Sequence, residues 1–315
     1  MKTLNRLYST RSMSRRYEVW FLRFGLADQS GAWWLRYLLM NLGRNRSAQQ
    51  PQGMPVQIWA TWFPRHGTPR TFIQGFPSDN LRLSERSQSP FHLQIADNTI
   101  NEDSCHGRMQ VDGHTISWDL KYRSTFHVTL STKGWIGFSR TPHSDAVFSG
   151  KITFDDRTFE GSPLGFGLQG HNCGYRHRNF WAWTHAYFDR GSEPPTTLEA
   201  LQYEMPLGLV FRKAVLWHRG VQHTFSRLKG EVQKGPEGLQ WQFVCAARDG
   251  SRLDARISGA APATHLLPYL KTDFSGSFDV ANNSLARAVI RLQIPSLPLE
   301  TLETSSGAVL EIAGL

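Results

Sequence analysis

The sequence predicts an all-β protein of two tandem barrel or sandwich domains with a few short helices. Its 315 residues are enough for two domains, since one domain usually takes about 100–200 residues. Many short runs alternate apolar and polar residues at a period of two, which is typical of β-strands. Turn-forming pairs such as Asp112-Gly113 and Asn282-Asn283 separate these runs. Short strands punctuated in this way favour a sandwich or a barrel.

The first two strands are predicted to form a hairpin. Residues 17–24 (YEVWFLRF) and 32–40 (AWWLRYLLM) are rich in strand-forming residues, and the loop between them holds Gly25 and Asp28. A short turn-rich loop between two such runs is a hairpin signal. A third strand is expected at 56–63 (VQIWATWF), after another turn-rich stretch.

The rest of the chain continues the strand pattern, with one predicted helix. Pro195, followed by two threonines and then by helix formers, predicts a short helix over 195–202. The further strand runs are 91–97, 107–122, 124–131, 150–161, 179–188, 207–220, 221–233, 239–248 and 287–294.

The predicted domain organisation has three parts. Residues 1–16, with the basic run RSMSRR at 11–16, are expected to be a flexible N-terminus. Residues 17–190 form the predicted N-terminal domain, and residues 191–315 the C-terminal one.

Composition narrows the class of partner. The net charge is +9, but the basic residues are spread along the chain, so we expect no nucleic-acid partner. No apolar run approaches the ~18 residues of a spanning helix, so no stable membrane insertion is expected. The N-terminus lacks the apolar core of a secretory signal, and three scattered cysteines imply no disulfide framework. We therefore expect a cytoplasmic protein.

Two arginines lie inside apolar strand runs. A period of two places Arg23 on the face of Tyr17, Val19 and Phe21, and pairing with residue 34 would set it beside Trp34. Arg36 shares its face with Trp34. One interpretation is that each arginine holds a substrate carboxylate or enolate, or polarises a carbonyl. The other is a structural cation that snorkels or pairs with Glu18.

The segment GHNCG at 170–174 is the most unusual polar motif. Gly170 and Gly174 permit a bulge or a close backbone approach. His171 can act as an acid or a base, and Asn172 can donate to a carbonyl. The histidines of this region match no zinc spacing, so no metal is expected. The next strand has one face that is either a cavity wall or a second packing layer, formed by Trp181, Trp183, His185 and Tyr187.

These motifs together resemble a known superfamily. The resemblance rests on residues 17–39, 58–63 (IWATWF), 116–122 (ISWDLKY), 150–174 and 180–188 (FWAWTHAYF). They are similar to the lipocalin-like superfamily of hydroxyneurosporene synthase, the AttH-like proteins and tocopherol cyclase, which includes lipocalin-like Diels–Alderases. Many bacterial relatives have tryptophan at the fourth position of the G-H-N-W-G motif, where this chain has Cys173.

The resemblance implies both a fold and a chemistry. The fold would be two tandem lipocalin-like (calycin-type) β-barrel domains with a largely apolar pocket in or between them. Members need no metal or organic cofactor, and they protonate, hydrate or cyclise isoprenoid-type or polyketide-type substrates. His171, Asn172, Trp181 and Trp183 match the motif and carry over as site candidates.

The aromatic content fits such a pocket. The chain has 11 Trp, 19 Phe and 8 Tyr, and aromatic faces stabilise cationic charge. We therefore expect a cofactor-free enzyme for cyclisation, whether acid-catalysed or Diels–Alder, hydration or isomerisation. The alternative is a non-catalytic carrier, whose pocket would hold no titratable group.

The candidate catalytic residues are His171, Asn172, Glu18, Asp119 and Arg36, and Asp189 is a further candidate acid. The candidate substrate-binding residues are Trp20, Arg23, Trp34, Trp59, Trp181, Trp183, His185 and Tyr187.

Overall fold

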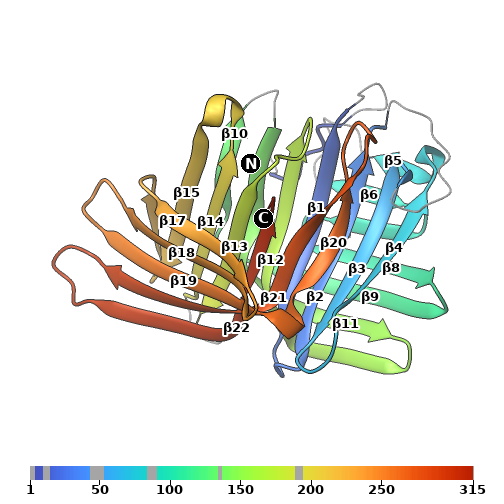
Figure 1. Ribbon diagram of the computed structural model, residues 1–315. Coiled ribbons are helices and arrows are strands. Elements are labelled where there is room, and N and C mark those ends of the chain that lie inside the picture. The colour runs from blue at the N-terminus through green and yellow to red at the C-terminus, as the bar shows by residue number, and fades with distance from the viewer. Residues whose placement is uncertain are drawn as a thin grey trace.

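The computed structural model describes residues 4–9, 15–42, 53–83, 91–133, 137–188 and 194–314. These residues form two large antiparallel sheets that curl side by side (Figure 1). The predicted all-β class is confirmed.

The first sheet runs through the N-terminal part of the chain. Its strand order is β4-β3-β2-β1-β12-β11-β9-β8-β7-β6-β5, and β10 pairs with β11. The strands are β1 (Tyr17–Leu26), β2 (Gly31–Met40), β3 (Val56–Pro64), β4 (Arg70–Phe76), β5 (Leu81–Leu83), β6 (His92–Ile95), β7 (Asn98–Asn101), β8 (Ser104–Val111), β9 (His114–Arg123), β10 (Val128–Lys133), β11 (Gly137–Phe154) and β12 (Arg157–Gly174).

The second sheet runs through the C-terminal part. Its order is β16-β15-β14-β13-β22-β21-β19-β18-β17, and β20 pairs with β21. The strands are β13 (Trp181–Phe188), β14 (Thr196–Glu204), β15 (Val210–His218), β16 (Val221–Phe225), β17 (Lys229–Gly235), β18 (Gly238–Ala246), β19 (Arg252–Ala260), β20 (His265–Leu270), β21 (Ser277–Gln293) and β22 (Glu300–Ala313). The described helices are single 3-10 turns, namely η2 (Ser78–Asn80), η3 (Pro206–Gly208) and η4 (Ala261–Ala263). None of the helices in the described ranges is long and apolar enough to cross a membrane.

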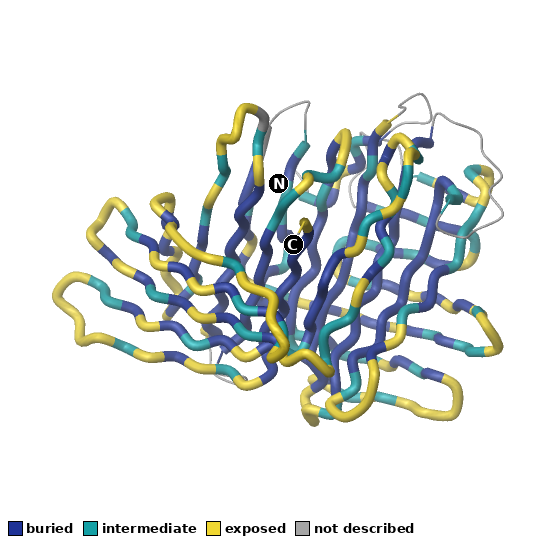
Figure 2. Tube along the Cα trace, viewed as in Figure 1, coloured by how far each residue is buried: buried dark blue, intermediate teal, exposed yellow. Residues whose placement is uncertain are grey.

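The described residues form three hydrophobic cores, of which one joins the two sheets. One lies within the curl of the first sheet and one within the curl of the second. The third lies between the sheets and takes residues from both, such as Phe21, Trp34, Trp183 and Val309. Burial is therefore continuous through the centre of the molecule, while the outer turns are exposed (Figure 2).

The predicted hairpin of β1 and β2 is confirmed. In it residue 23 pairs with residue 34, so Arg23 lies opposite Trp34. The face of Trp20, Leu22 and Phe24 points into the first core, and the face of Val19 and Phe21 points into the layer between the sheets. Both faces are covered, so the hairpin is apolar almost throughout.

Two sequence predictions for the middle of the chain are corrected. Residues 196–204 form strand β14 and not a helix. Strand β13, assigned from sequence to the N-terminal domain, pairs with β14 and β22 in the second sheet. The change of sheet therefore falls between Gly174 and Trp181, before the predicted domain boundary at residue 190.

The N-terminal segment is also more ordered than predicted. Asn5, Leu7 and Ser9 are buried, and Leu7 packs in the first core. Arg16 is buried too, while residues 10–14 of the predicted flexible part lie outside the described residues.

Candidate functional site

A pocket of about 600 Å³ opens between the two sheets. Strands β1, β2, β10, β11 and β12 of the first sheet line one side, and β13, β14, β20 and β22 of the second line the other. Volumes of about 300–1,000 Å³ are typical of small-molecule sites. An adjoining polar pocket of about 600 Å³ shares five lining residues with it, namely Arg176, His177, Arg178, Thr272 and Asp273.

The two glycines of GHNCG make room for aromatic rings in the pocket wall. Phe21 pairs directly with Gly170, and Tyr17 pairs with Gly174. A Cβ atom at Gly170 would lie 2.2 Å from Cζ of the Phe21 ring. The register between β1 and β12 is unbroken here, and the bulge lies on the neighbouring β11, between Arg140 and His143. The glycines therefore serve the predicted close approach across the strands.

Aromatic side chains from both sheets form most of the wall. Trp183 meets Phe21 edge-on at 5.8 Å between ring centroids, and it lies 6.3 Å from Trp34. The other aromatic lining residues are Tyr17, Phe138, Tyr175, Trp181, Tyr203 and Tyr269. This arrangement suits an apolar, extended or cyclic molecule.

Arg36 sits in this wall inside a box of aromatic rings. Its guanidinium carbon lies 4.5 Å from the ring centroid of Tyr269, 5.0 Å from that of Trp59 and 5.6 Å from that of Trp34. Only 7% of the residue is exposed. Cation–π contacts of this kind stabilise a desolvated guanidinium.

A carboxyl group, Glu311 of β22, lines the same pocket. Its Oε1 accepts a hydrogen bond from Trp181 Nε1 at 3.0 Å, and its Oε2 accepts longer ones from Tyr269 and Asn282 at 3.4 Å. Burial raises the pKa of Glu311, and the nearby positive charge of Arg36 opposes that shift. The carboxyl therefore holds its proton more readily than an exposed glutamate.

Two further polar groups complete the lining. Asn172 lies on the pocket face of β12, and its buried Oδ1 has no hydrogen-bond partner within the described structure. His177 stacks on Tyr17 with 4.3 Å between ring centroids. Desolvation, with Arg36 nearby, lowers the pKa of His177 to about 3, so its ring is neutral at ordinary pH.

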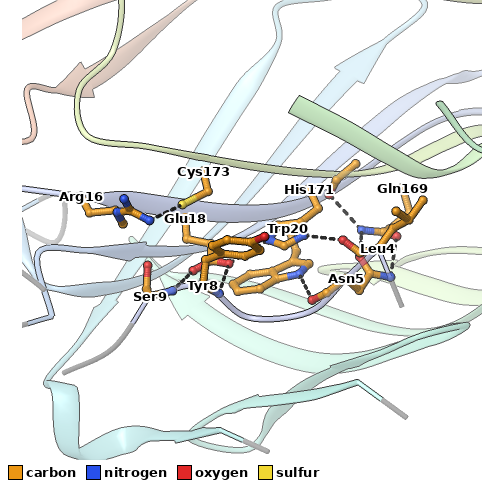
Figure 3. Close-up of polar contacts among 11 residues, drawn as sticks. Leu4, Asn5, Tyr8, Ser9, Arg16, Glu18, Trp20, Gln169, His171 and Cys173 are labelled. Atoms are coloured by element: carbon orange, nitrogen blue, oxygen red, sulfur yellow. Dashed lines mark hydrogen bonds and ion pairs between the residues drawn. The ribbon is translucent and has the colours of Figure 1, made fainter. Parts of the chain in front are cut away.

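His171 and Glu18 form a buried pair on the opposite face of β12 and β1. His171 Nε2 lies 2.9 Å from Glu18 Oε1, and its Nδ1 lies 2.9 Å from the carbonyl oxygen of Leu4 (Figure 3). Glu18 also accepts hydrogen bonds from the backbone N–H groups of Tyr8 and Ser9. Both residues are fully buried, and neither lines the pocket. The pair anchors the N-terminal segment.

The structure also places several other predicted site residues outside the pocket. Asp119 is exposed on β9. Trp20 lies in the first core, where its Nε1 donates to the carbonyl of Asn5. Arg23 donates from Nη1 to the carbonyl of Gly307 at 3.1 Å, and from Nη2 to that of Ala308 at 2.8 Å and to that of Ser284.

Of the β13 face that the sequence singled out, His185 and Tyr187 belong to the packing layer between the sheets. His185 Nε2 donates to the Ser144 carbonyl at 2.7 Å, and burial lowers the pKa of His185 to about 3. Tyr187 packs on Phe166. Trp59 lies behind Arg36 and does not itself line the pocket. Asp189 lies outside the described residues.

The pocket therefore contains Arg36, Asn172, Trp34, Trp181 and Trp183 of the predicted set. It also contains residues that the sequence analysis did not select, above all Glu311, His177 and Tyr269. Like Arg23 and Arg36, Glu311 is a charged residue inside an apolar run, AVLEIA at 308–313, so the same sequence pattern points to it.

Comparison with known proteins places the fold. Family models and curated protein sequences give no match to the chain. Solved structures do match over nearly its whole length. CghA with Sch210972 is 10% identical with a TM-score of 0.65, covering 95% of this chain and 88% of CghA. The chain has the lipocalin-like fold.

Two further lipocalin-like structures extend the comparison. Kievitone hydratase from Nectria haematococca is 10% identical with a TM-score of 0.56, covering 96% of this chain and 90% of the hydratase. The AttH-like protein NE1406 from Nitrosomonas europaea is 11% identical with a TM-score of 0.55, covering 95% and 92% of the two chains. The resemblance read from the strand motifs is confirmed in its fold, two sheets in tandem.

Proposed function

We propose that this lipocalin-like protein is a cofactor-independent enzyme. It binds a hydrophobic isoprenoid-type or polyketide-type substrate in the pocket between the sheets and catalyses cyclisation, hydration or isomerisation. The observation that carries the proposal is the buried carboxyl of Glu311 in an aromatic wall. A pure carrier needs no titratable group in its pocket. Two neighbours in fold, the Diels–Alderase CghA and kievitone hydratase, support these reaction classes.

The lining residues suit the roles that such reactions require. Glu311, with its raised pKa, donates a proton to an alkene or a carbonyl oxygen. The faces of Trp34, Trp181 and Trp183 stabilise the cationic charge that follows. For a pericyclic closure, the walls hold the chain in a folded conformation, and a hydrogen-bond donor on a carbonyl lowers the barrier.

A conversion assay tests this proposal. The purified protein is incubated with linear polyenes and enones, and products are followed by liquid chromatography and mass spectrometry. Hydration adds the mass of one water, whereas cyclisation and isomerisation change retention at constant mass. For acid-catalysed chemistry, Glu311→Gln removes the donated proton, so we expect a loss of about 100-fold or more in turnover.

Asp119→Asn is the matched control, because Asp119 is exposed outside the pocket. It should retain full activity. Wild-type turnover in Glu311→Gln would exclude Glu311 as the acid. Tight binding of a molecule that is always released unchanged would favour the carrier.

A further inference from the structure

The guanidinium of Arg36 is a buried positive charge. Its Nε and Nη1 atoms are buried and have no hydrogen-bond partner within the described ranges. Among the described residues, no carboxylate oxygen lies within the 4.0 Å ion-pair distance of it. The Tyr269 hydroxyl accepts a hydrogen bond from the Arg36 side chain.

A buried positive charge of this kind is destabilising unless a counter-ion or hydrogen-bond acceptors compensate for the lost water. Burying a cation away from water is unfavourable unless it is paired and hydrogen-bonded. The aromatic box around Arg36 offsets part of that cost. Glu311, whose charge acts on Arg36, accepts its hydrogen bonds from Trp181, Tyr269 and Asn282 instead. Two guanidinium nitrogens of Arg36, a residue that lines the pocket, are thus without an acceptor among the residues that the structure describes.

We infer that Arg36 binds the negatively charged end of the substrate, a planar pair of oxygens attached to an apolar body. A carboxylate and the enolate of an acidic β-diketone share this chemistry. Arginine suits it because the planar guanidinium matches a planar oxygen pair and forms charge-assisted hydrogen bonds. This inference rests on the proposed function of the same pocket and names its substrate class.

The rim of the pocket supports an anionic ligand. Arg15, Arg176 and Arg178 line it, against one acidic residue, Asp273, among the described rim residues. Arg15 and Arg176 are exposed. A positive rim raises the local concentration of anions and speeds their association. The aromatic interior then accommodates the apolar body.

The test compares matched ligands that differ only in charge. Retinoic acid and its methyl ester form one pair, and a long-chain acyl β-diketone and its enol methyl ether form the other. Binding to the full-length protein is measured by quenching of tryptophan fluorescence, since Trp34, Trp181 and Trp183 line the pocket. We expect wild type to prefer the anion of at least one pair by about 10- to 100-fold. The pair that shows the preference identifies the carboxylate or the enolate as the source of the charge.

The variant Arg36→Met should remove this preference and leave the affinity for the uncharged ligand unchanged. Arg108→Met is the control, because Arg108 is exposed on β8, away from the pocket. Equal affinity for anion and neutral analogue in wild type would overturn the inference even if Arg36→Met does not fold. A preference that survives in folded Arg36→Met would overturn it as well. Binding of neither member of either pair would contradict the pocket itself, and with it the proposed function.

Discussion

Charged residues inside apolar strands have different roles in this protein, and their surroundings decide which. Arg23 on β1 and Arg36 on β2 both point into the layer between the sheets. Arg23 donates hydrogen bonds to backbone carbonyls of the second sheet, so it joins the two sheets. Arg36 meets aromatic rings and a cavity, and its Nε and Nη1 atoms have no hydrogen-bond partner in the described part of the chain. The sequence pattern alone gave both residues the same alternatives, because it does not show what lies across the layer.

Gly170 shows how one missing side chain shapes the pocket. In Gly170→Ala, the new methyl group would collide with the ring of Phe21, which lines the pocket and supports Trp183. We expect a loss of about 1–3 kcal/mol in the free energy of unfolding, as for other overpacked cores. Urea denaturation measures it.

Gly235→Ala is the control for that substitution. A Cβ atom there meets nothing within 4 Å, so stability should stay the same or rise slightly. An unchanged stability in Gly170→Ala would mean that Phe21 moves aside at no cost. Glycine at position 170 would then not be needed to make room for the Phe21 ring.

The site was partly predictable at the level of single residues. A period of two correctly placed Trp34 and Arg36 on one face of β2, and Trp181 and Trp183 on one face of β13. His171 was selected with Asn172 because both belong to one motif, but neighbouring strand residues point to opposite faces. Only Asn172 reaches the pocket.

Strand β14 shows why local sequence misled at the scale of an element. Its segment TTLEALQ contains good helix formers after a proline. In the structure eight successive residues of β14 are buried, because one face packs in the second core and the other in the layer between the sheets. A strand that is covered on both faces loses the alternation by which strands are recognised.

The N-terminal segment is a structural part of the first sheet. Asn5 and Gln169 exchange two hydrogen bonds between their side chains, at 3.1 and 3.0 Å. The Leu4 carbonyl and the Tyr8 N–H hold the buried pair of His171 and Glu18. The predicted flexible terminus therefore satisfies polar groups that the sheet buries.

Substitutions in this segment should reduce stability in an alternating pattern. Leu7→Ala removes a side chain from the first core and should cost about 2–4 kcal/mol. Asn5→Ala removes both side-chain hydrogen bonds with Gln169, which keeps only its bond to the Gly170 carbonyl among those described, and should cost about 1–3 kcal/mol. Arg6 is exposed between them, so Arg6→Ala should change stability by less than about 0.5 kcal/mol. Three small and equal effects in chemical denaturation would show that the segment is not part of the cooperative fold.

At the scale of the whole molecule, the layer between the sheets creates the site. Part of this layer is closed by Arg23, His185 and Tyr187, and another part is open as the pocket. Two domains were predictable from length and strand number. The layer was not, because it joins residues such as Arg23 and Ala308 that are far apart in the sequence. Glu311 was missed for this reason, since its partners come from β13, β20 and β21.

Glu199 links the two sheets and makes their association sensitive to pH. Its Oε1 accepts hydrogen bonds from Thr141 of the first sheet at 2.8 Å and from Trp183 at 3.0 Å. Its buried Oε2 has no partner within the described structure. Burial raises the pKa of Glu199 from 4.5 to about 7. The folded protein therefore binds this proton more tightly than the unfolded chain, and the resulting stability, complete below pH 4.5, is lost as the pH rises through about 7.

Glu199→Gln should remove this loss, because glutamine resembles the protonated carboxyl and still accepts from Thr141 and Trp183. The free energy of unfolding of the variant, relative to that of wild type, should rise by about 2–3 kcal/mol between about pH 5 and about pH 8.

His177 and His185, with pKa values lowered to about 3, act in the other direction: the stability they provide is present above about pH 6.5 and is lost as the pH falls. They are the same in both proteins, so the difference between the two urea-denaturation curves isolates Glu199. Glu231→Gln makes the same change of charge at an exposed position on β17, and its difference from wild type should not vary with pH. If the stability difference between Glu199→Gln and wild type also stays constant with pH, the carboxylate of Glu199 is stabilised in the layer between the sheets. In that case its protonation does not control how the two sheets are held together.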